Sequence, residues 1–169
     1  ALYRAKGDGR GTFRFFEAAM DEQMQTRRIM EQDLRKGLSA GEFELYYQPV
    51  VNLESNEISG FEALLRWNHP EQGQVPPSAF IPLAEEIGFI VPLGEWVIRQ
   101  ACLAAARWPK HLTVAVNISA VQFRGSSLML VIVNALAESG LNPTRLEIEI
   151  TESVLLQDRE ATLAVLHQL

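Results

Sequence analysis

Three segments of this chain constrain its fold most, because each alternates apolar and polar residues with the two-residue period of a β-strand. They lie at residues 58–67, 112–118 and 145–151, and helical patterns separate them. Successive side chains point to opposite faces of a strand, so each segment has one apolar face and one face with oxygen-bearing side chains near its end. Strands that alternate with helices favour a largely parallel sheet. The sequence therefore predicts an α/β fold with helices on the apolar face.

Further elements flank these segments. A strand at residues 43–51 precedes the first segment across a polar turn at 52–57, and a proline-rich loop covers 70–77. Helices are expected at 78–88, at 95–108, from Ser126 or Ser127 to Gly140, and from Asp158 to Leu169.

The N-terminal part has a different pattern. Residues 12–16 follow a glycine-rich turn and are expected to form a short strand. Residues 17–36 are mostly polar helix formers, which indicates a connecting helix that ends at Gly37. Its apolar stripe is thin, so we favour a solvated helix over a coiled-coil seam.

Composition narrows the class of protein. The chain has 169 residues, 47% hydrophobic and 21% charged, which suits one globular domain or a little more. A net charge of −6 argues against a broad basic surface for duplex nucleic acid, but allows a small nucleotide held by one or two arginines. Cys102 is the only cysteine, so a reducing compartment is the simpler interpretation, and its alanine-rich helix places it in the core.

No apolar run is long enough to span a bilayer, and residues 1–11 lack the apolar stretch of a secretory signal. We therefore expect a cytoplasmic protein, or the cytoplasmic part of a membrane-anchored parent. The chain begins without Met and stops within a helical pattern, so we expect it to be an excerpt of a longer protein.

Oxygen-bearing side chains stand late in the three strands that define the fold. Glu62, Asn117 and Glu149 would converge on one mouth if the strands belong to a β/α barrel, where reactive groups gather at the carboxyl ends. Such a set favours Mg²⁺ or Mn²⁺ over zinc. Structural ion pairs are the alternative, because Arg66 shares a face with Glu62 and can either pair with it or bind a phosphate. The histidines lack metal spacing and are expected at the surface: His69, His111 and His167.

Five short sequence blocks follow one another between residues 34 and 169. Glu62-Ala63-Leu64, followed by Leu65-Arg66-Trp67, resembles the EAL motif in its extended Glu-x-Leu-x-Arg form. The other blocks run from Tyr47 to Val51, Pro77 to Glu85, Val116 to Ser119 and Glu149 to Ser153. A three-letter motif alone is weak, whereas five blocks in this order are specific. Together they resemble the EAL domain family of cyclic di-GMP phosphodiesterases.

The resemblance implies a TIM-barrel-like (β/α) EAL fold, of which this chain holds the N-terminal half. It implies metal-dependent hydrolysis of cyclic di-GMP to linear pGpG in bacterial second-messenger signalling, with two Mg²⁺ or Mn²⁺ ions that stabilise the attacking and leaving oxygens. By motif, Glu62, Asn117 and Glu149 are the metal ligands and, with Glu152, the catalytic set.

The same blocks imply further roles. Gln48 and Arg66 would contact the substrate, with Arg66 on a phosphate, and Leu64 would pack against the nucleotide. Glu152 would hold the loop that shapes the metal site and the dimer contact, so a homodimer through the EAL domain is also expected. Simpler structural roles are the alternatives: a strand hydrogen bond for Gln48, a loop cap for Asn117 and an N-cap partner for Glu152.

Ala1-Leu2-Tyr3-Arg4-Ala5-Lys6 with Gly9-Arg10 resembles the closing helix and turn of a GGDEF domain, the diguanylate cyclase fold, but the Gly-Gly-Asp-Glu-Phe motif is absent. The expected organisation is thus a GGDEF remnant at 1–16, a linker helix at 17–37 and the N-terminal part of an EAL domain at 38–169, all from a GGDEF–EAL tandem parent.

A complete barrel needs about 250 residues and eight strands. The family's Asp-Asp pair, lysine, later glutamate and final glutamine are expected beyond Leu169, so we expect the intact parent to be the enzyme. The fragment alone should be inactive, and it should aggregate, pair or be unstable because its sheet has an open edge at 145–151. The alternatives are a catalytically inactive EAL-type receptor for cyclic di-GMP and an interaction module.

Overall fold

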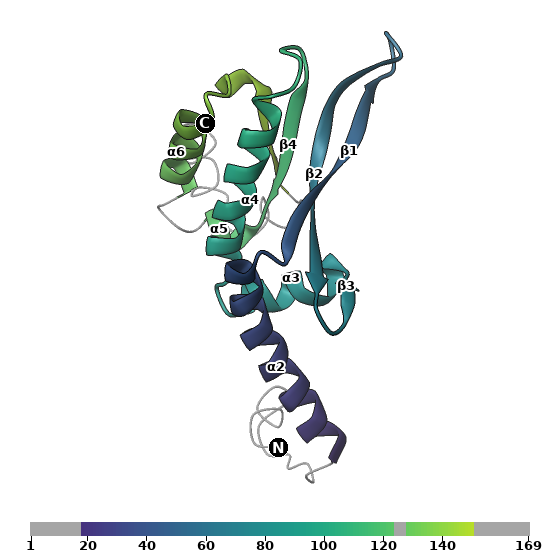
Figure 1. Ribbon diagram of the computed structural model, residues 1–169, viewed down its shortest axis with the longest axis vertical. Coiled ribbons are helices and arrows are strands. Elements are labelled where there is room, and N and C mark those ends of the chain that lie inside the picture. Colours follow the sequence, from purple (N-terminus) through teal and green to yellow (C-terminus); the bar gives the residue numbers. More distant parts are fainter. Residues whose placement is uncertain (1–17, 124–127, 151–169) are drawn as a thin grey trace, which may run out of the picture.

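The described part of this computed structural model comprises residues 18–123 and 128–150, and it contains one five-stranded sheet with helices on one face (Figure 1). β1 (Phe43–Asn52) and β2 (Glu57–His69) form a long antiparallel hairpin. β4 (Thr113–Ile118) runs parallel to β2, and β5 (Leu146–Ile150) runs parallel to β4. β3 (Gly73–Val75) pairs with the last residues of β2. The predicted α/β fold is confirmed, but the described sheet is mixed rather than largely parallel, because β2 pairs antiparallel with β1 and β3 and parallel with β4.

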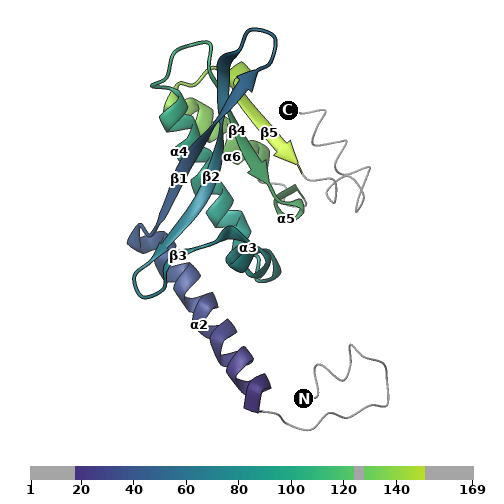
Figure 2. The same ribbon diagram turned by 90° about the vertical axis from the view of Figure 1, so that its right-hand side faces the viewer.

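Helices fill the connections between the parallel strands. α3 (Pro77–Glu86) and α4 (Ile90–Ala105) lie between β3 and β4 in the chain. The return to β5 contains α5 (Ala120–Phe123), α6 (Leu128–Ser139) and the 3₁₀ helix η1 (Pro143–Arg145). Figure 2 shows α4 and α6 behind the sheet, on the same side of it. Within the described residues, no helix is both long enough and apolar enough to cross a membrane.

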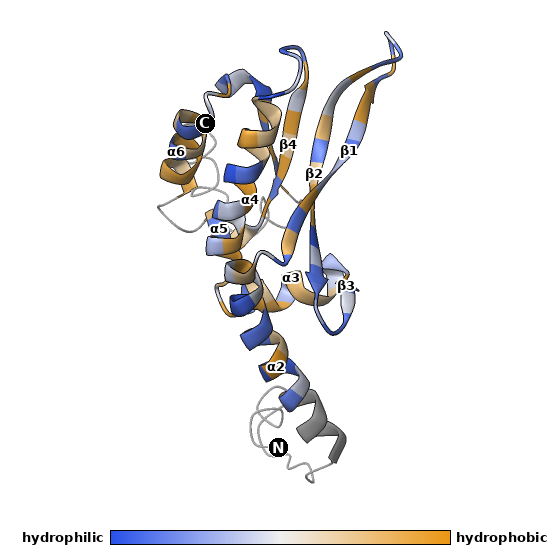
Figure 3. Cartoon of the chain, viewed as in Figure 1, coloured by the Kyte–Doolittle hydropathy of each residue, from blue (hydrophilic) through white to orange (hydrophobic). Residues whose placement is uncertain are grey.

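The main core lies between the sheet and α4 and α6. Ala63 of β2 and Val114 and Val116 of β4 are buried there, which confirms the predicted apolar face. Cys102 of α4 is fully buried in the same cluster, as expected, and burial raises the pKa of its thiol to about 11. Hydrophobic and hydrophilic residues alternate along β1 and β2 in Figure 3, the pattern of strands with two unlike faces.

The connecting helix α2 (Ala18–Ala40) docks on the body through its C-terminal half. Leu34 is fully buried in a second core cluster with Phe43, Trp67 and Phe80. The ring centroid of Trp67 lies 5.3 Å from that of Phe43 and 5.5 Å from that of Phe80. The expectation of a solvated helix is therefore wrong for this half, because one apolar side chain per turn is enough to seat it.

The helix α2 does not end at Gly37, as predicted, but continues to Ala40 and stops before Gly41, whose φ is 74°. Gly37 is small for a packing reason. A Cβ at this position would lie 2.8 Å from Oε2 of Glu42 and 3.0 Å from Nε1 of Trp67. The glycine thus permits a close approach between helix and sheet, whereas the left-handed residue Gly41 terminates the helix.

Two short elements were not predicted. β3 lies inside the expected proline-rich loop and is too short and polar for a period to be visible, and α5 directly follows β4. α4 begins before Glu95, at Ile90, because Pro92 is tolerated in a first helical turn.

Arg145 belongs to η1 instead of the next strand, and its buried side chain donates hydrogen bonds to the carbonyls of Leu112 (2.7 Å) and Ala105 (2.8 Å). The predicted strand at 12–16, the caps at Ser126 or Ser127 and the helix from Asp158 lie outside the described residues.

The sheet is open within the described residues. Its order is β1-β2-β4-β5, so β1 and β5 form the two edges, and β5 lies beside β4 in Figure 2. No described element covers the face of the sheet that points away from the helices (Figure 2), and the side chains of the candidate site stand on this face.

Candidate metal centre and ligand pocket

Strand register brings the predicted site residues to one face of the sheet. Gln48 of β1 pairs with Glu62 of β2, and Glu62 pairs with Ala115 of β4. Two residues further along β4, Asn117 pairs with Glu149 of β5. Directly paired residues point to the same side of a sheet, as do residues two apart on one strand. All four polar side chains therefore stand on the face opposite the helices.

Contacts between the side chains tighten this arrangement. Nδ2 of Asn117 donates a hydrogen bond of 2.7 Å to Oε1 of Glu62. Partial burial raises the pKa of Glu149, and the negative charges of Glu62 and Glu147 raise it further. The structure thus places Glu62, Asn117 and Glu149 side by side, with two carboxylates close enough to repel each other.

This donor set fits a hard divalent cation in chemical type. Carboxylate and amide oxygens are ligands that Mg²⁺ and Mn²⁺ accept, and a cation would relieve the repulsion between Glu62 and Glu149. Among the described residues no group of three or more His, Cys, Asp or Glu is arranged for a metal, so the candidate set is two carboxylates and one amide. Such an ion would need further oxygen ligands from water, substrate or other residues.

Arg66 stands on the same face of β2 as Glu62, four residues further along the strand. Its Cζ atom is 5.4 Å from the ring centroid of Tyr46, and its Nη1 atom donates to the carbonyl of Leu65 at 2.9 Å. No ion pair among the described residues joins Arg66 to Glu62. Of the two interpretations that the sequence allowed, the structural ion pair is therefore not formed, and the guanidinium retains donors for another anion.

A pocket of about 290 Å³ opens beside Arg66 and Asn117, close to the lower end of the range of small-molecule sites. It lies between β2, the end of β4 and the helices α3, α4 and α5. Its lining is mainly apolar, with a few polar side chains. The lining residues include Leu64, Arg66, Asn117, Pro77, Ile81, Glu85, Ile90, Val97, Ser119 and Gln122.

Three polar residues of this pocket were not singled out from the sequence. Glu85 and Ser119 lie inside two of the sequence blocks that resemble the EAL family, but the resemblance gave these two residues no role. Gln122 carried no signal, because its helix α5 was not predicted. It is buried, and its Oε1 atom accepts a hydrogen bond of 3.0 Å from the backbone N–H of Ser119.

The other predicted site residues have mixed positions. Gln48 is exposed on β1 opposite Glu62, and Leu64 is half-buried at the pocket wall. Glu152, expected to hold the loop at the metal site, lies outside the described residues.

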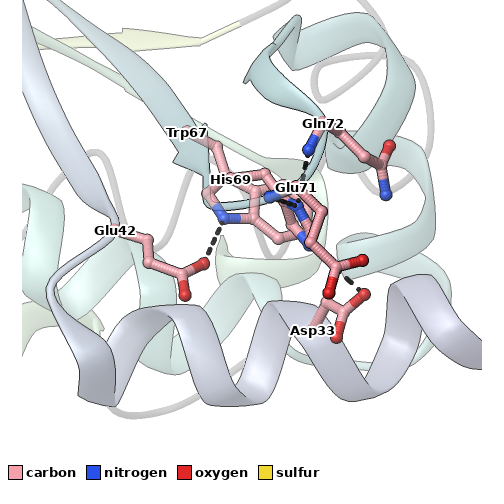
Figure 4. Close-up of polar contacts among 6 residues, drawn as sticks. All are labelled: Asp33, Glu42, Trp67, His69, Glu71 and Gln72. Carbon is pink, nitrogen blue, oxygen red and sulfur yellow. Dashed lines mark hydrogen bonds and ion pairs between the residues drawn. The ribbon is translucent and has the colours of Figure 1, made fainter.

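A second polar cluster joins α2 to the end of β2, away from this site (Figure 4). His69 is buried rather than at the surface, which corrects the expectation for it. Its Nδ1 atom accepts the backbone N–H groups of Glu71 and Gln72, both at 3.1 Å, and its Nε2 atom lies 3.3 Å from Oδ2 of Asp33 on α2. A histidine can be buried here because both ring nitrogens have partners.

The comparisons with known proteins agree with the resemblance. The family model for the EAL domain matches residues 31–169. The bifunctional diguanylate cyclase/cyclic di-GMP phosphodiesterase MucR of Pseudomonas aeruginosa is 40% identical over 173 residues, which cover 100% of this chain and 25% of MucR. The cyclic di-GMP phosphodiesterase PdeR of Escherichia coli is 37% identical over 171 residues, covering 99% of this chain and 26% of PdeR.

A solved structure supports the fold. The PaMucR phosphodiesterase in complex with c-di-GMP matches with a TM-score of 0.79 and 40% identity, over 82% of this chain and 58% of that one. The chain spans only a fifth to a quarter of the length of the curated relatives it matches first. Because the family model covers most of the chain, the chain belongs to the EAL domain family.

Proposed function

We propose that the intact protein containing this chain hydrolyses cyclic di-GMP to linear pGpG. The observation that carries the proposal is the convergence of Glu62, Asn117 and Glu149 on one open face, with the hydrogen bond of 2.7 Å between Asn117 and Glu62. The named phosphodiesterases among its relatives support the choice of substrate.

In this proposal Glu62, Asn117 and Glu149 hold the metal ions. Bound Mg²⁺ or Mn²⁺ supplies an activated water and neutralises charge on the attacking and leaving oxygens of a phosphodiester. The guanidinium of Arg66 binds a phosphate oxygen pair, for which its planar fork is suited, and Tyr46 beneath it limits its rotation. Leu64 packs against a base at the wall of the pocket, and Gln48 contacts the substrate from β1.

The proposed organisation is a GGDEF–EAL tandem, with residues 1–16 from the end of the GGDEF domain, 17–37 as the linker helix and 38–169 as the first part of a TIM-barrel-like EAL domain. The coverage of 58% of the PaMucR structure supports a partial domain. Glu152 belongs to this chain, but further catalytic residues would come from the remainder of the barrel, so activity belongs to the intact protein, which we propose acts as an EAL-mediated homodimer.

The direct test incubates the intact protein with cyclic di-GMP and Mg²⁺ or Mn²⁺ and separates the nucleotides by chromatography. We expect pGpG from the wild type, none from Glu62→Ala and none when a chelator is added. Glu57→Ala is the matched control, because Glu57 is an exposed glutamate at the first position of the same strand. Binding of cyclic di-GMP without pGpG would replace the hydrolase by a receptor.

A further inference from the structure

The end of β4 is held by a reciprocal set of hydrogen bonds that starts two residues after Asn117. The hydroxyl oxygen of Ser119 accepts the backbone N–H of Val121 at 3.2 Å, and the side-chain oxygen of Gln122 accepts the backbone N–H of Ser119 at 3.0 Å. The backbone carbonyl of Ser119 also accepts the N–H of Gln122 at 3.0 Å. Ser-x-x-Gln with these bonds is a variant of the capping box, in which the serine side chain accepts from the second rather than the third helical N–H, so that side chains satisfy two backbone N–H groups at the start of α5.

A second helix, distant in sequence, holds the same serine. The hydroxyl of Ser119 donates a hydrogen bond of 2.6 Å to Oε1 of Glu85 on α3, while it accepts from Val121. The hydroxyl therefore uses its one donor on α3 and an acceptor site on α5. Because both hydrogen bonds are made by the hydroxyl group of Ser119, they fix the direction in which the chain leaves the sheet after β4.

The helix α4 packs against this group of hydrogen-bonded residues through Gly94. Gly94 lies so close to Gln122 that a Cβ would stand 2.7 Å from Cδ of the glutamine and closer still to its Nε2 atom. Gln122 is buried and has little room to turn. The three helices α3, α4 and α5 thus converge on Ser119, through Glu85, Gly94 and Gln122.

Only Ile118 separates this set from Asn117, and Ile118 is itself anchored in the core, with 2% of its surface exposed. Asn117 is exposed and its side chain reaches Glu62, so the direction of its amide depends on how the backbone at the strand end is held. An error of about 1 Å in a metal or substrate ligand is costly.

We propose that Glu85, Ser119 and Gln122 are positioning residues, which orient Asn117 toward Glu62 and so preorganise the cation site. The proposal rests on the proposed function, since it assigns these residues to the same site. The alternative is that these hydrogen bonds only stabilise the fold. If they position Asn117, their loss should weaken cation binding; if they only stabilise the fold, it should not.

The test measures the dissociation constant of Mn²⁺ for the intact protein by electron paramagnetic resonance, without substrate, together with kcat and KM for cyclic di-GMP and the thermal midpoint. Ser119→Ala and Glu85→Ala should weaken Mn²⁺ binding by about 10- to 100-fold, as loss of groups that support metal ligands commonly does. Ser119→Thr and Glu85→Gln retain the hydroxyl and the acceptor, and should restore most of the affinity. The loss should appear in kcat more than in KM.

Asn142→Ala is the matched control, because it removes another cap, the one whose side chain accepts from the N–H of Thr144 at 3.1 Å before β5. It should lower the thermal midpoint and leave Mn²⁺ affinity unchanged. The proposal is overturned if Ser119→Ala and Glu85→Ala weaken Mn²⁺ binding no more than Asn142→Ala does.

If Ser119→Ala does not fold, Glu85→Ala decides, since it leaves the capping box in place. A wild type that binds no Mn²⁺ and makes no pGpG would sink the proposed function and this proposal with it, whereas an active wild type with unaffected variants would sink only the positioning role.

Discussion

Substitution of Gly94 by alanine tests the packing around the end of β4 most sharply. In an ordinary helix interior, alanine is more favourable than glycine by about 1 kcal/mol. Here the new Cβ would stand 2.7 Å from Cδ of Gln122, so something has to move. If the amide turns away, the N–H of Ser119 loses its partner, which costs about 1–3 kcal/mol. If α4 shifts instead, overpacking costs about 1–3 kcal/mol.

The conflict belongs to one pair of residues, so a double-mutant cycle isolates it. Urea unfolding of the wild type, Gly94→Ala, Gln122→Ala and the double variant gives four free energies of unfolding. Gly94→Ala should range from neutral to about 2 kcal/mol destabilising in the wild type, yet stabilise the Gln122→Ala protein by up to about 1 kcal/mol. The coupling should be about 1–3 kcal/mol. A coupling below about 0.5 kcal/mol, the usual error of additivity, would refute the contact.

Three further predictions concern other parts of the chain. Burial raises the pKa of the Cys102 thiol to about 11, so at pH 8 the folded protein should resist alkylation by iodoacetamide and react only after urea is added. Rapid labelling of the native protein would contradict this. The pKa of Glu149 is raised in the folded state, so its ionisation opposes folding as the pH rises through that pKa. In the presence of a chelator, Glu149→Gln should therefore be more stable than the wild type at pH 7 and lose this advantage below the ordinary pKa of 4.5. An equal gain at both pH values in urea titrations would show that the charge of Glu149 is not the reason. His69→Ala removes the acceptor for two backbone N–H groups and the partner of Asp33, so it should lower the free energy of unfolding by about 1–3 kcal/mol. His111 is exposed, so His111→Ala should change this free energy little. Equal effects of the two substitutions in urea unfolding would argue against the buried cluster.

The alternation of side chains made the sheet and one face of the site predictable. Ala63, Val114 and Val116 could be assigned to the core from period alone, and the same parity put Glu62 and Asn117 on the other face. Parallel strands carry their late residues to a common edge, so proximity of Glu62, Asn117 and Glu149 followed once the order of the strands was assumed. The family blocks supplied that order, which composition and period do not.

Contacts between segments distant in sequence were not predictable. His69 lies two residues after Trp67 and shares its apolar face, but the strand was expected to end at Trp67. The partners of the imidazole come from α2 and from its own turn. Gly37 carries the usual signal of a helix end, although its actual role is to admit the indole of Trp67. Gln122 matters through Ser119 and Gly94, and a four-residue helix such as α5 is too short to show a period.

The central claim is that Glu62, Asn117 and Glu149 share one divalent cation site, and Mn²⁺ binding to the intact protein tests it most directly. Titration followed by electron paramagnetic resonance should show saturable binding to the wild type and to Glu57→Ala. Each of Glu62→Ala, Asn117→Ala and Glu149→Ala should lose about 10-fold or more in affinity, because each removes a ligand from the same site. Wild-type affinity in all three variants would show that these side chains hold no common cation, and the account would fail.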